Sequence, residues 1–316
     1  MRTWKSVLSV AITLLSAAAI VGCGSSSSSS SSATSSAAPA ATGTSSAATS
    51  SAAAGSNAAV AALVPSSIKS KGALTVAADA SYAPNEFIGP DGHTVVGMDA
   101  DLSAALAKLM GLKANVVNAT FDTIIPGLAA GKYDMGASSF TDTKAREKVV
   151  DFVDYFQAGT SFFTKSSGGV AVTNLASLCG KTVSVESGTT EETDAKGQSA
   201  KCKSAGKPAV SVLVFPTQTA ANLALNSGRA QVSMADSPVA AYQVKQSHGA
   251  FKLVGQTYGT APYGLAIPKH SGLAPAVLAG VKALIKDGTY NQILTKWGIT
   301  SGALPASQVK INGAIS

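Results

Sequence analysis

The sequence predicts an α/β fold in two lobes, built from two successive runs of alternating strands and helices. Each expected strand is a short apolar segment, and most are followed by a segment in which apolar residues recur at helical spacing. The pattern begins at Ala73 and starts again at Thr182. Roughly 250 residues follow Pro65, enough for two lobes of ordinary domain size. Such alternation is typical of parallel sheets covered by helices on both faces.

The first run contains three expected strands and three expected helices. The strands are expected at 73–79, 115–119 and 134–139, and the helices begin near 99, at 122 and near 143, the last ending at 149. Asp99 or Asp101 would cap the first helix and Gly111 would end it. Pro126 would lie in the first turn of the second helix, where proline is tolerated.

The second run is longer and ends close to the C-terminus. Its expected strands are 182–187, 212–215, 231–235, 251–254 and 263–267, and its expected helices begin at 190 and cover 217–227, 237–246, 273–286 and 289–296. Ligands of open α/β sheets bind beyond the carboxyl ends of the strands. The candidate binding loops therefore follow Asp79, Ser139, Ser187 and Asp236.

The first residues have the features of an export signal. Arg2 and Lys5 precede an apolar segment, 7–20, that is long enough for a signal peptide and too short for a membrane-spanning helix. Ile20-Val21-Gly22-Cys23 resembles the bacterial lipobox, in which the cysteine is lipidated. We therefore expect residues 1–22 to be removed and Cys23 to anchor an exported protein to the outer face of the cell membrane. The alternative is an ordinary signal peptide with a chance cysteine.

A low-complexity segment follows Cys23. Residues 24–61 are mostly Ser, Ala and Thr and include no charged residue. Such a segment cannot bury enough apolar surface to offset its chain entropy. We expect residues 23–64 to form a lipidated, disordered tether with a root-mean-square reach of about 35 Å.

Charge and cysteine content exclude some classes of site. The formal charge is +7, and without Arg2 and Lys5 the remaining 22 basic and 17 acidic residues leave +5. The lysines are scattered singly, so no nucleic-acid partner is expected. The three histidines are isolated, so no metal or other cofactor is expected. Cys179 and Cys202 are an even pair in an exported chain and predict a disulfide; a metal or redox pair is the weaker alternative, because their spacing is not CxxC.

Several ordered motifs occur along both runs, at or near the candidate binding loops. In the first run the motifs are Asp79-Ala-Ser-Tyr-Ala-Pro84, Gly97-Met-Asp-Ala-Asp-Leu102, Phe121-Asp-Thr-Ile-Ile-Pro-Gly-Leu-Ala-Ala-Gly-Lys-Tyr-Asp134 and Ser138-Ser-Phe-Thr-Asp-Thr-Lys-Ala-Arg146. In the second run they are Ser187-Gly-Thr-Thr190, Ala235-Asp236 and Asp287-Gly-Thr-Tyr-Asn-Gln-Ile-Leu-Thr-Lys-Trp-Gly298. Together these motifs resemble those of family 3 extracellular solute-binding proteins, which include the histidine-, lysine/arginine/ornithine- and glutamine-binding proteins. The resemblance covers nearly all of 71–304.

The resemblance implies a clamp of two lobes joined by two hinge strands that close on a ligand. The hinges should lie near 157–164 and 258–268. Lobe 1 would contain 65–160 and 263–316, and lobe 2 would contain 161–262. The implied function is the substrate-binding component of an ABC importer for a polar amino acid, acting as a monomer that delivers its ligand to a membrane permease.

The resemblance also assigns the groups that hold the amino acid's backbone. Arg146 would bind the ligand carboxylate, helped by Thr190 in the Gly188-Thr189-Thr190 loop at a helix start. Asp236 would accept from the ligand ammonium. Each residue has a simpler interpretation: Arg146 as a solvated helix residue, Thr189 with Glu192 as a capping box, and Asp236 as a helix cap.

The remaining expected ligand contacts come from lobe 1. Ser138, Ser139 and Thr141 would supply carbonyl and hydroxyl groups. Tyr82 and Phe121 would enclose the aliphatic part of the ligand, unless they are ordinary core aromatics. Asp79 corresponds to an acid that meets the side chain in binders of basic amino acids. Asn85 and Glu86 depart from the apolar or aromatic residues more usual after the proline.

Two other functions fit the same fold. The fold also serves enzymes that dehydrate cyclohexadienyl acids, which need a positioned acid or base, and the candidates here are Glu86 and Glu186. A tethered clamp can also present its ligand to a separate receptor. We favour the transport protein, because no histidine lies in the matched loops.

Overall fold

The computed structural model describes residues 55–315, which belong to one compact unit. The predicted signal peptide, Cys23 and most of the predicted tether lie outside the described residues. Within residues 55–315, no helix has the length and apolar character needed to cross a membrane.

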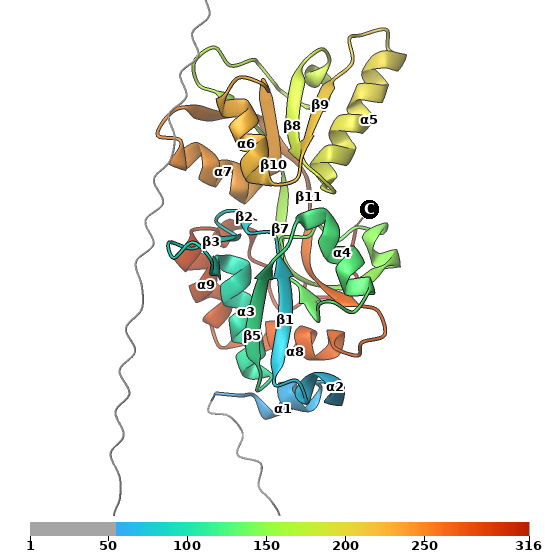
Figure 1. The fold of residues 1–316 in the computed structure, drawn as a ribbon, viewed down its shortest axis with the longest axis vertical. Helices are drawn as coiled ribbons and strands as arrows, with labels where there is room; N and C mark the ends of the chain where they lie inside the picture. Colours follow the sequence, from blue (N-terminus) through green and yellow to red (C-terminus); the bar gives the residue numbers. More distant parts are fainter. Residues whose placement is uncertain (1–54, 316) are drawn as a thin grey trace, which may run out of the picture. The chain divides into compact units, whose positions relative to one another are not determined.

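An eight-stranded mixed sheet runs through this unit in the order β5-β1-β6-β11-β7-β10-β8-β9 (Figure 1). The strands are β1 (Ala73–Ala78), β5 (Lys113–Asn118), β6 (Met135–Gly136), β7 (Val150–Lys165), β8 (Thr182–Glu186), β9 (Ser211–Phe215), β10 (Val232–Asp236) and β11 (Phe251–Pro268). Neighbours among β5, β1 and β6 are parallel, as are β10, β8 and β9. The predicted parallel strands are therefore present, but β7 and β11 run antiparallel to each other and to their outer neighbours.

Helices pack against the strands in both halves of this sheet. They are α1 (Ala58–Ala62), α2 (Ser66–Lys69), α3 (Met98–Leu109), α4 (Phe121–Ala129), α5 (Thr190–Ser204), α6 (Gln218–Asn226), α7 (Ser237–Gln246), α8 (Ala274–Lys286) and α9 (Thr289–Trp297). Short 3₁₀ helices cover Arg146–Lys148, Leu175–Leu178 and Thr300–Gly302, and a small second sheet contains β2 (Ser81–Tyr82), β3 (Glu86–Ile88) and β4 (Val95–Val96). We call β1–β6 with α1–α4, α8 and α9 lobe 1, and β8–β10 with α5–α7 lobe 2.

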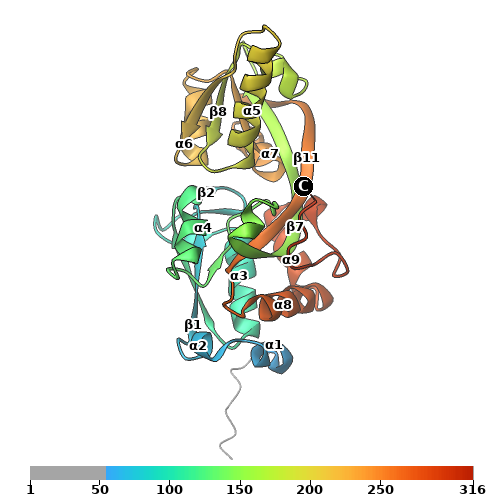
Figure 2. The ribbon, with the colours of Figure 1, turned by 90° about the vertical axis from the view of Figure 1, so that its right-hand side faces the viewer.

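Strands β7 and β11 connect the two lobes (Figure 2). They pair from Phe251 opposite Lys165 to Pro268 opposite Val150, with register shifts between Val254 and Ala261 and between Tyr263 and Gly264. The predicted hinges fall within these strands. The two strands expected at 251–254 and 263–267 are in fact parts of β11, because the intervening turn-like sequence forms bulges rather than ending the strand.

Each lobe has its own hydrophobic core. In lobe 1 the core forms around Leu74, Leu106 and Leu294, and in lobe 2 it forms around Val183 and Met234. Separate cores are what a hinged clamp requires, because each lobe can then keep its packing while the hinge changes.

The folded part of the chain begins earlier than the predicted boundary at residue 65. Helix α1 is capped by the Asn57 side chain, which accepts from the backbone N–H groups of Ala59 and Val60. Val60 and Val64 are buried in the core of lobe 1. The last residues assigned to the tether therefore belong to the lobe, because these two valines supply the apolar contacts that the Ser/Ala segment lacks.

Two predicted helix starts were wrong. Helix α3 begins at Met98, so Asp99 and Asp101 lie inside its first turn and Gly97 is the cap residue. A glycine is needed at position 97, because a Cβ there would lie 2.2 Å from the backbone oxygen of Asn85. Helix α4 begins at Phe121, because the Asp79 carboxylate accepts from the Phe121 backbone N–H at 2.9 Å. Pro126 therefore lies in the second turn of α4 rather than the first.

Two further elements are shorter than expected. The strand predicted at 134–139 is only Met135–Gly136, because the chain leaves the sheet at Ser138 and turns at Ser139, where φ is +50°. The helix predicted at 143–149 is reduced to the 3₁₀ helix Arg146–Lys148, since β7 begins at Val150. Both departures place polar residues in the space between the lobes.

Candidate functional site

A narrow cleft between the lobes contains almost all of the predicted ligand-binding residues. The cleft has a volume of about 280 Å³. Its lining residues are Asp79, Tyr82, Glu86, Phe121, Ser138, Ser139, Thr141, Arg146, Glu186, Thr189, Thr190, Glu191 and Asp236. Side chains of the two lobes therefore meet directly across this space.

Arg146 is turned into the cleft and is not a solvated helix residue. Its guanidinium carbon, Cζ, lies 5.3 Å from the centroid of the Phe121 ring and 5.5 Å from that of the Phe140 ring. These two rings stack on each other. It donates to the backbone oxygen of Thr141 at 2.8 Å and, across the cleft, to that of Gly188 at 2.9 Å. Two of its five N–H groups are thus committed, and the others can bind a carboxylate.

Asp236 occupies the cap position of α7 but makes no side-chain capping bond. Its carboxylate instead accepts from the Tyr82 hydroxyl at 3.0 Å, and that hydroxyl accepts from the Asp236 backbone N–H. Burial, reinforced by the nearby charge of Glu191, raises the pKa of the Asp236 carboxyl well above its usual value. A ligand ammonium group placed here would favour the ionised carboxylate.

Tyr82 is a core residue and a cleft residue at once. It comes from lobe 1, yet it packs with Phe163, Leu225 and Val239 in a cluster dominated by lobe 2. The two interpretations of Tyr82 offered by the sequence are therefore compatible, and the side chain forms part of the contact between lobes.

The first turn of α5 forms the lobe 2 wall of the cleft. The Thr189 hydroxyl caps the helix by accepting from the Glu192 backbone N–H, and the Glu192 carboxylate accepts from the Gly188 backbone N–H. The expected reciprocal cap is therefore shifted by one residue. Thr189 and Thr190 both line the cleft, whereas Gly188 contributes only the backbone oxygen that faces Arg146. The backbone N–H groups of this turn suit an anion.

Glu191 is a cleft residue that the sequence patterns did not reveal. It is 2% exposed, and its carboxylate accepts from the hydroxyls of Thr160 on β7 and Thr190. The negative charge of Glu191 acts to raise the pKa of both Arg146 and Asp236. The only signal in the sequence was its position directly after the matched Gly188-Thr189-Thr190 loop.

Asp79 and the serines of lobe 1 form the opposite end of the cleft. The Asp79 carboxylate accepts from the backbone N–H groups of Ser81 and Phe121, while its own N–H donates to the Ser138 hydroxyl. Burial raises the Asp79 pKa despite these hydrogen bonds. Asp79 therefore holds the two loops together as well as facing the cleft.

Ser139 is held by a pair of buried acids, Glu86 and Asp99. Its backbone N–H donates to Asp99, and its hydroxyl lies within 3.2 Å of both carboxylates. Burial and the charge of Asp99 raise the Glu86 pKa well above its usual value, so the pair can share a proton. The unusual Asn85-Glu86 sequence thus supports the Ser138-Ser139 loop, with the Asn85 amide donating to Ser139 at 2.9 Å.

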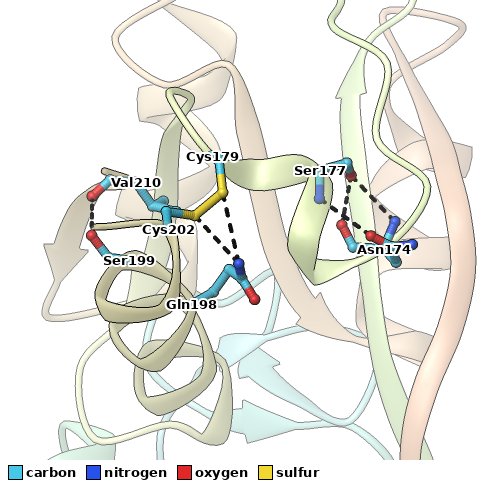
Figure 3. The surroundings of a disulfide bond; sticks show 7 residues. All are labelled: Asn174, Ser177, Cys179, Gln198, Ser199, Cys202 and Val210. Carbon is cyan, nitrogen blue, oxygen red and sulfur yellow. Dashed lines mark hydrogen bonds between the residues drawn. A yellow bond between two sulfur atoms is a disulfide. The ribbon is translucent and has the colours of Figure 1, made fainter. Parts of the chain in front are cut away.

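The predicted pairing of Cys179 with Cys202 is confirmed. The bond joins the segment before β8 to the last turn of α5, and Gln198 lies against both sulfurs (Figure 3). Among the described residues, no group of three or more His, Cys, Asp or Glu side chains is placed to hold a metal ion.

The comparisons with known proteins agree with this geometry. The profile of the bacterial extracellular solute-binding proteins, family 3, matches residues 74–300. The chain belongs to this family. The predicted family and its two-lobed α/β fold are confirmed.

The relatives of this chain include proteins named for the binding of arginine or amino acids. The "Arginine-binding protein ArgT" of Corynebacterium glutamicum is 37% identical over 246 residues, or 78% of this chain and 80% of that protein. A solved "ancestral arginine-binding protein bound to arginine" has 37% identity and a TM-score of 0.66 over 72% of this chain and 98% of its own. An "ancestral arginine-binding protein bound to glutamine" has 36% identity and the same TM-score and coverage. The "ancestral amino acid-binding protein AncCDT-1, a precursor of cyclohexadienyl dehydratase" has 35% identity and a TM-score of 0.66 over 73% of this chain and 97% of its own.

Proposed function

We propose that this protein is the substrate-binding component of an ABC importer and that its ligand is a cationic amino acid, with arginine as the first candidate. The observation that carries the proposal is the charge of the cleft, in which five carboxyl groups face one guanidinium. An α-amino acid with a neutral side chain brings no net charge to such a site, whereas arginine brings one net positive charge. The names of the arginine-binding relatives support the same ligand.

The backbone of the ligand fits the groups at the Arg146 end of the cleft. Arg146 would bind the carboxylate with the donors that it does not give to Thr141 and Gly188, and the N–H of Thr190 would assist. Asp236, with the oxygens of Ser139 and Thr141, would accept from the ammonium. Tyr82 and Phe121 would enclose the aliphatic part of the side chain.

Ligand binding would act through closure of the clamp. The assigned groups come from both lobes, so a bound ligand stabilises the closed state specifically. The closed protein would then be delivered to the permease. Closure is aided by the hydrogen bond of Ser187 with Asp122 at 2.9 Å across the rim of the cleft.

A thermal-shift series tests the ligand directly. The purified full-length protein, stripped of bound ligand by unfolding and refolding, is compared with all common amino acids, ornithine and citrulline. A ligand at about 100 times its Kd adds roughly 2.7 kcal/mol to folding stability. Arginine, lysine or ornithine should raise the Tm most. A larger shift with glutamine would reject the cationic ligand but keep the amino-acid clamp, and no shift with any amino acid would reject both.

A turnover assay separates transport from catalysis. Glu86 and Glu186, the candidate acids for a dehydratase, both line the cleft. Incubation with prephenate and arogenate should yield no product if the protein only binds its ligand. Measurable turnover that is lost in Glu186→Gln would favour the enzyme instead.

Anchoring through Cys23 is tested by fractionation. The expected lipid on Cys23 should place the wild-type protein in the membrane fraction, and Cys23→Ser should release it to the soluble exported fraction. Membrane retention of both forms would contradict the assigned anchor.

A further inference from the structure

Glu186 stands at the carboxyl end of β8 and faces the cleft from lobe 2. It is 2% exposed, and its Oε1 atom has no hydrogen-bond partner in the part of the chain that the structure describes. A buried carboxylate oxygen without a partner is unfavourable, because it has lost its water without gaining a donor. The position therefore suits a group that brings its own donor or positive charge.

The neighbouring acids at this end are already occupied. Both Asp79 oxygens accept from backbone N–H groups, those of Ser81 and Phe121. Both Glu86 oxygens lie within hydrogen-bond distance of serine hydroxyls. Glu186 is thus the carboxyl group at the Asp79 end that retains an oxygen for a ligand.

The electrostatic surroundings of Glu186 are negative. The groups that face it are the carboxylates of Asp79 and Glu191, the Tyr82 hydroxyl and the backbone N–H of Gln218. Burial, followed by the charge of Asp79, raises the Glu186 pKa well above its usual value. A positive group placed between these acids would remove this repulsion.

The aromatic floor of the cleft connects Glu186 with the groups proposed for the ligand backbone. Arg146 stacks over the Phe121 ring, while the Phe121 backbone N–H donates to Asp79. A ligand whose carboxylate binds Arg146 can therefore lay its side chain along Phe121 toward Asp79. Glu186 meets the end of such a side chain from the opposite lobe.

We propose that Glu186, with Asp79 behind it, forms a cation subsite that selects ligands whose side chain ends in a guanidinium or ammonium group. This inference rests on the proposed function and adds the residue that decides the ligand class. Because Glu186 belongs to lobe 2 and Asp79 to lobe 1, the same contact couples the ligand's side chain to closure.

The test compares arginine with citrulline, which has nearly the same shape and the same backbone groups but a neutral end. Calorimetry on wild-type protein should give arginine at least about 100-fold the affinity of citrulline. In Glu186→Gln the ratio should fall at least tenfold, mainly through loss of arginine affinity. An unchanged ratio, or a wild-type preference for citrulline, would overturn the proposal.

Glu191→Gln is the matched control, because it makes the same change at a cleft carboxylate whose two oxygens already accept from Thr160 and Thr190. It should alter the affinities for arginine and citrulline by similar factors and leave their ratio within about threefold. A collapse of the ratio in Glu191→Gln but not in Glu186→Gln would assign the selection to Glu191 instead. If the wild type binds no amino acid at all, the proposed function fails, and this result is distinct from a failure of the subsite.

A pH series supplies a second readout. Glu186 must be ionised to attract a cation, and its raised pKa delays ionisation on going from acid to neutral pH. The ratio of arginine to citrulline affinity should therefore rise from pH 5 to pH 8 in the wild type. The ratio cancels titration of groups that bind the shared backbone, such as Asp236. In Glu186→Gln the rise should be clearly smaller, because only Asp79 still titrates within the subsite, and a slope equal to that of the wild type would contradict the assigned role.

Discussion

Asp236 is placed at a helix start but is not used to cap the helix. Its backbone begins α7, whereas its carboxylate turns to Tyr82 and the cleft. Since the Tyr82 hydroxyl already donates to one oxygen, the other oxygen can accept from a ligand. The side chain can therefore be neutralised without loss of the helix.

We expect Asp236→Asn to fold and to lose its ligand. An asparagine oxygen can still accept from Tyr82, but the buried ammonium of the ligand would have no counter-charge, which costs about 3 kcal/mol or more. Affinity for the amino acid should fall at least about 100-fold by calorimetry. Asp287→Asn, at the exposed end of α8, is the control and should bind normally. Tight binding by Asp236→Asn would reject the assigned role.

A second residue-scale feature is the buried acid pair of Asp142 and Asp154 under the C-terminal segment. Burial and the charge of Asp142 raise the pKa of Asp154 to about 8, and burial raises that of Asp142 to about 6. Residues 310–314 cover the pair, and a Cβ on Gly313 would lie 2.0 Å from an Asp154 oxygen.

This pair should make the protein less stable as pH rises. An acid with a higher pKa in the folded than in the unfolded state keeps its proton on folding, so the stabilisation is present below about pH 4 and is lost as pH rises toward 8. Urea unfolding at pH 5, 7 and 9 should show this decline in the wild type. Asp154→Asn should weaken the decline, and an unchanged slope would place its origin elsewhere.

At the scale of elements, α5 has a functional end and an anchored end. Its first turn lines the cleft, and Glu191 and Asp194 bind Thr160 of β7 and Tyr258 of β11. Its last turn carries the disulfide partner Cys202 (Figure 3). The helix is thus tied to both connecting strands near the cleft and to lobe 2 at the far end.

Loss of the disulfide should lower stability more than affinity. Closing a loop of this length restricts the unfolded chain and contributes about 3 kcal/mol in the chain-entropy model. The double variant Cys179→Ser/Cys202→Ser should unfold at clearly lower urea concentration and bind its ligand within about threefold of wild type. Dithiothreitol should destabilise the wild type but not the variant. A large loss of affinity would show that the bond also positions the first turn of α5.

At the scale of the whole described unit, closure brings backbone into close contact at the rim of the cleft. Gly188 in lobe 2 has φ +78°, and a Cβ there would lie 2.9 Å from the Cβ of Asp122 in lobe 1. Gly206 has φ +68°, and a Cβ there would meet no atom within 4 Å, so it offers the same backbone strain without the contact.

Gly188→Ala should therefore impair closure while Gly206→Ala does not. Both variants should lose about 1 kcal/mol of stability through the left-handed backbone. Only Gly188→Ala should lose ligand affinity, by tenfold or more, because the methyl group meets Asp122 when the lobes approach. Small-angle scattering with saturating ligand should show incomplete compaction. Equal affinities for the two variants would contradict this account.

Much of the fold could be predicted from local pattern. Helix α7 matches its predicted range, and α6, α8 and α9 match theirs to within a residue at either end, because amphipathic spacing and turn residues act over a few positions. The errors lie where distant groups intervene. The carboxylate of Asp79 starts α4, and pairing with β7 keeps β11 continuous through its glycines.

The sequence by itself determined the family, the two-lobed α/β architecture and nearly every residue of the cleft, because these are carried by ordered motifs and periodic patterns. It also determined the disulfide, through an even pair of cysteines in a chain with an export signal. The tertiary structure alone decided what each acid does. Asp79 accepts backbone N–H groups, Glu86 supports Ser139, Glu191 binds a connecting strand and Glu186 keeps an unpaired oxygen among the described residues. These roles depend on burial and on partners far away in the chain, and neither is encoded in local spacing.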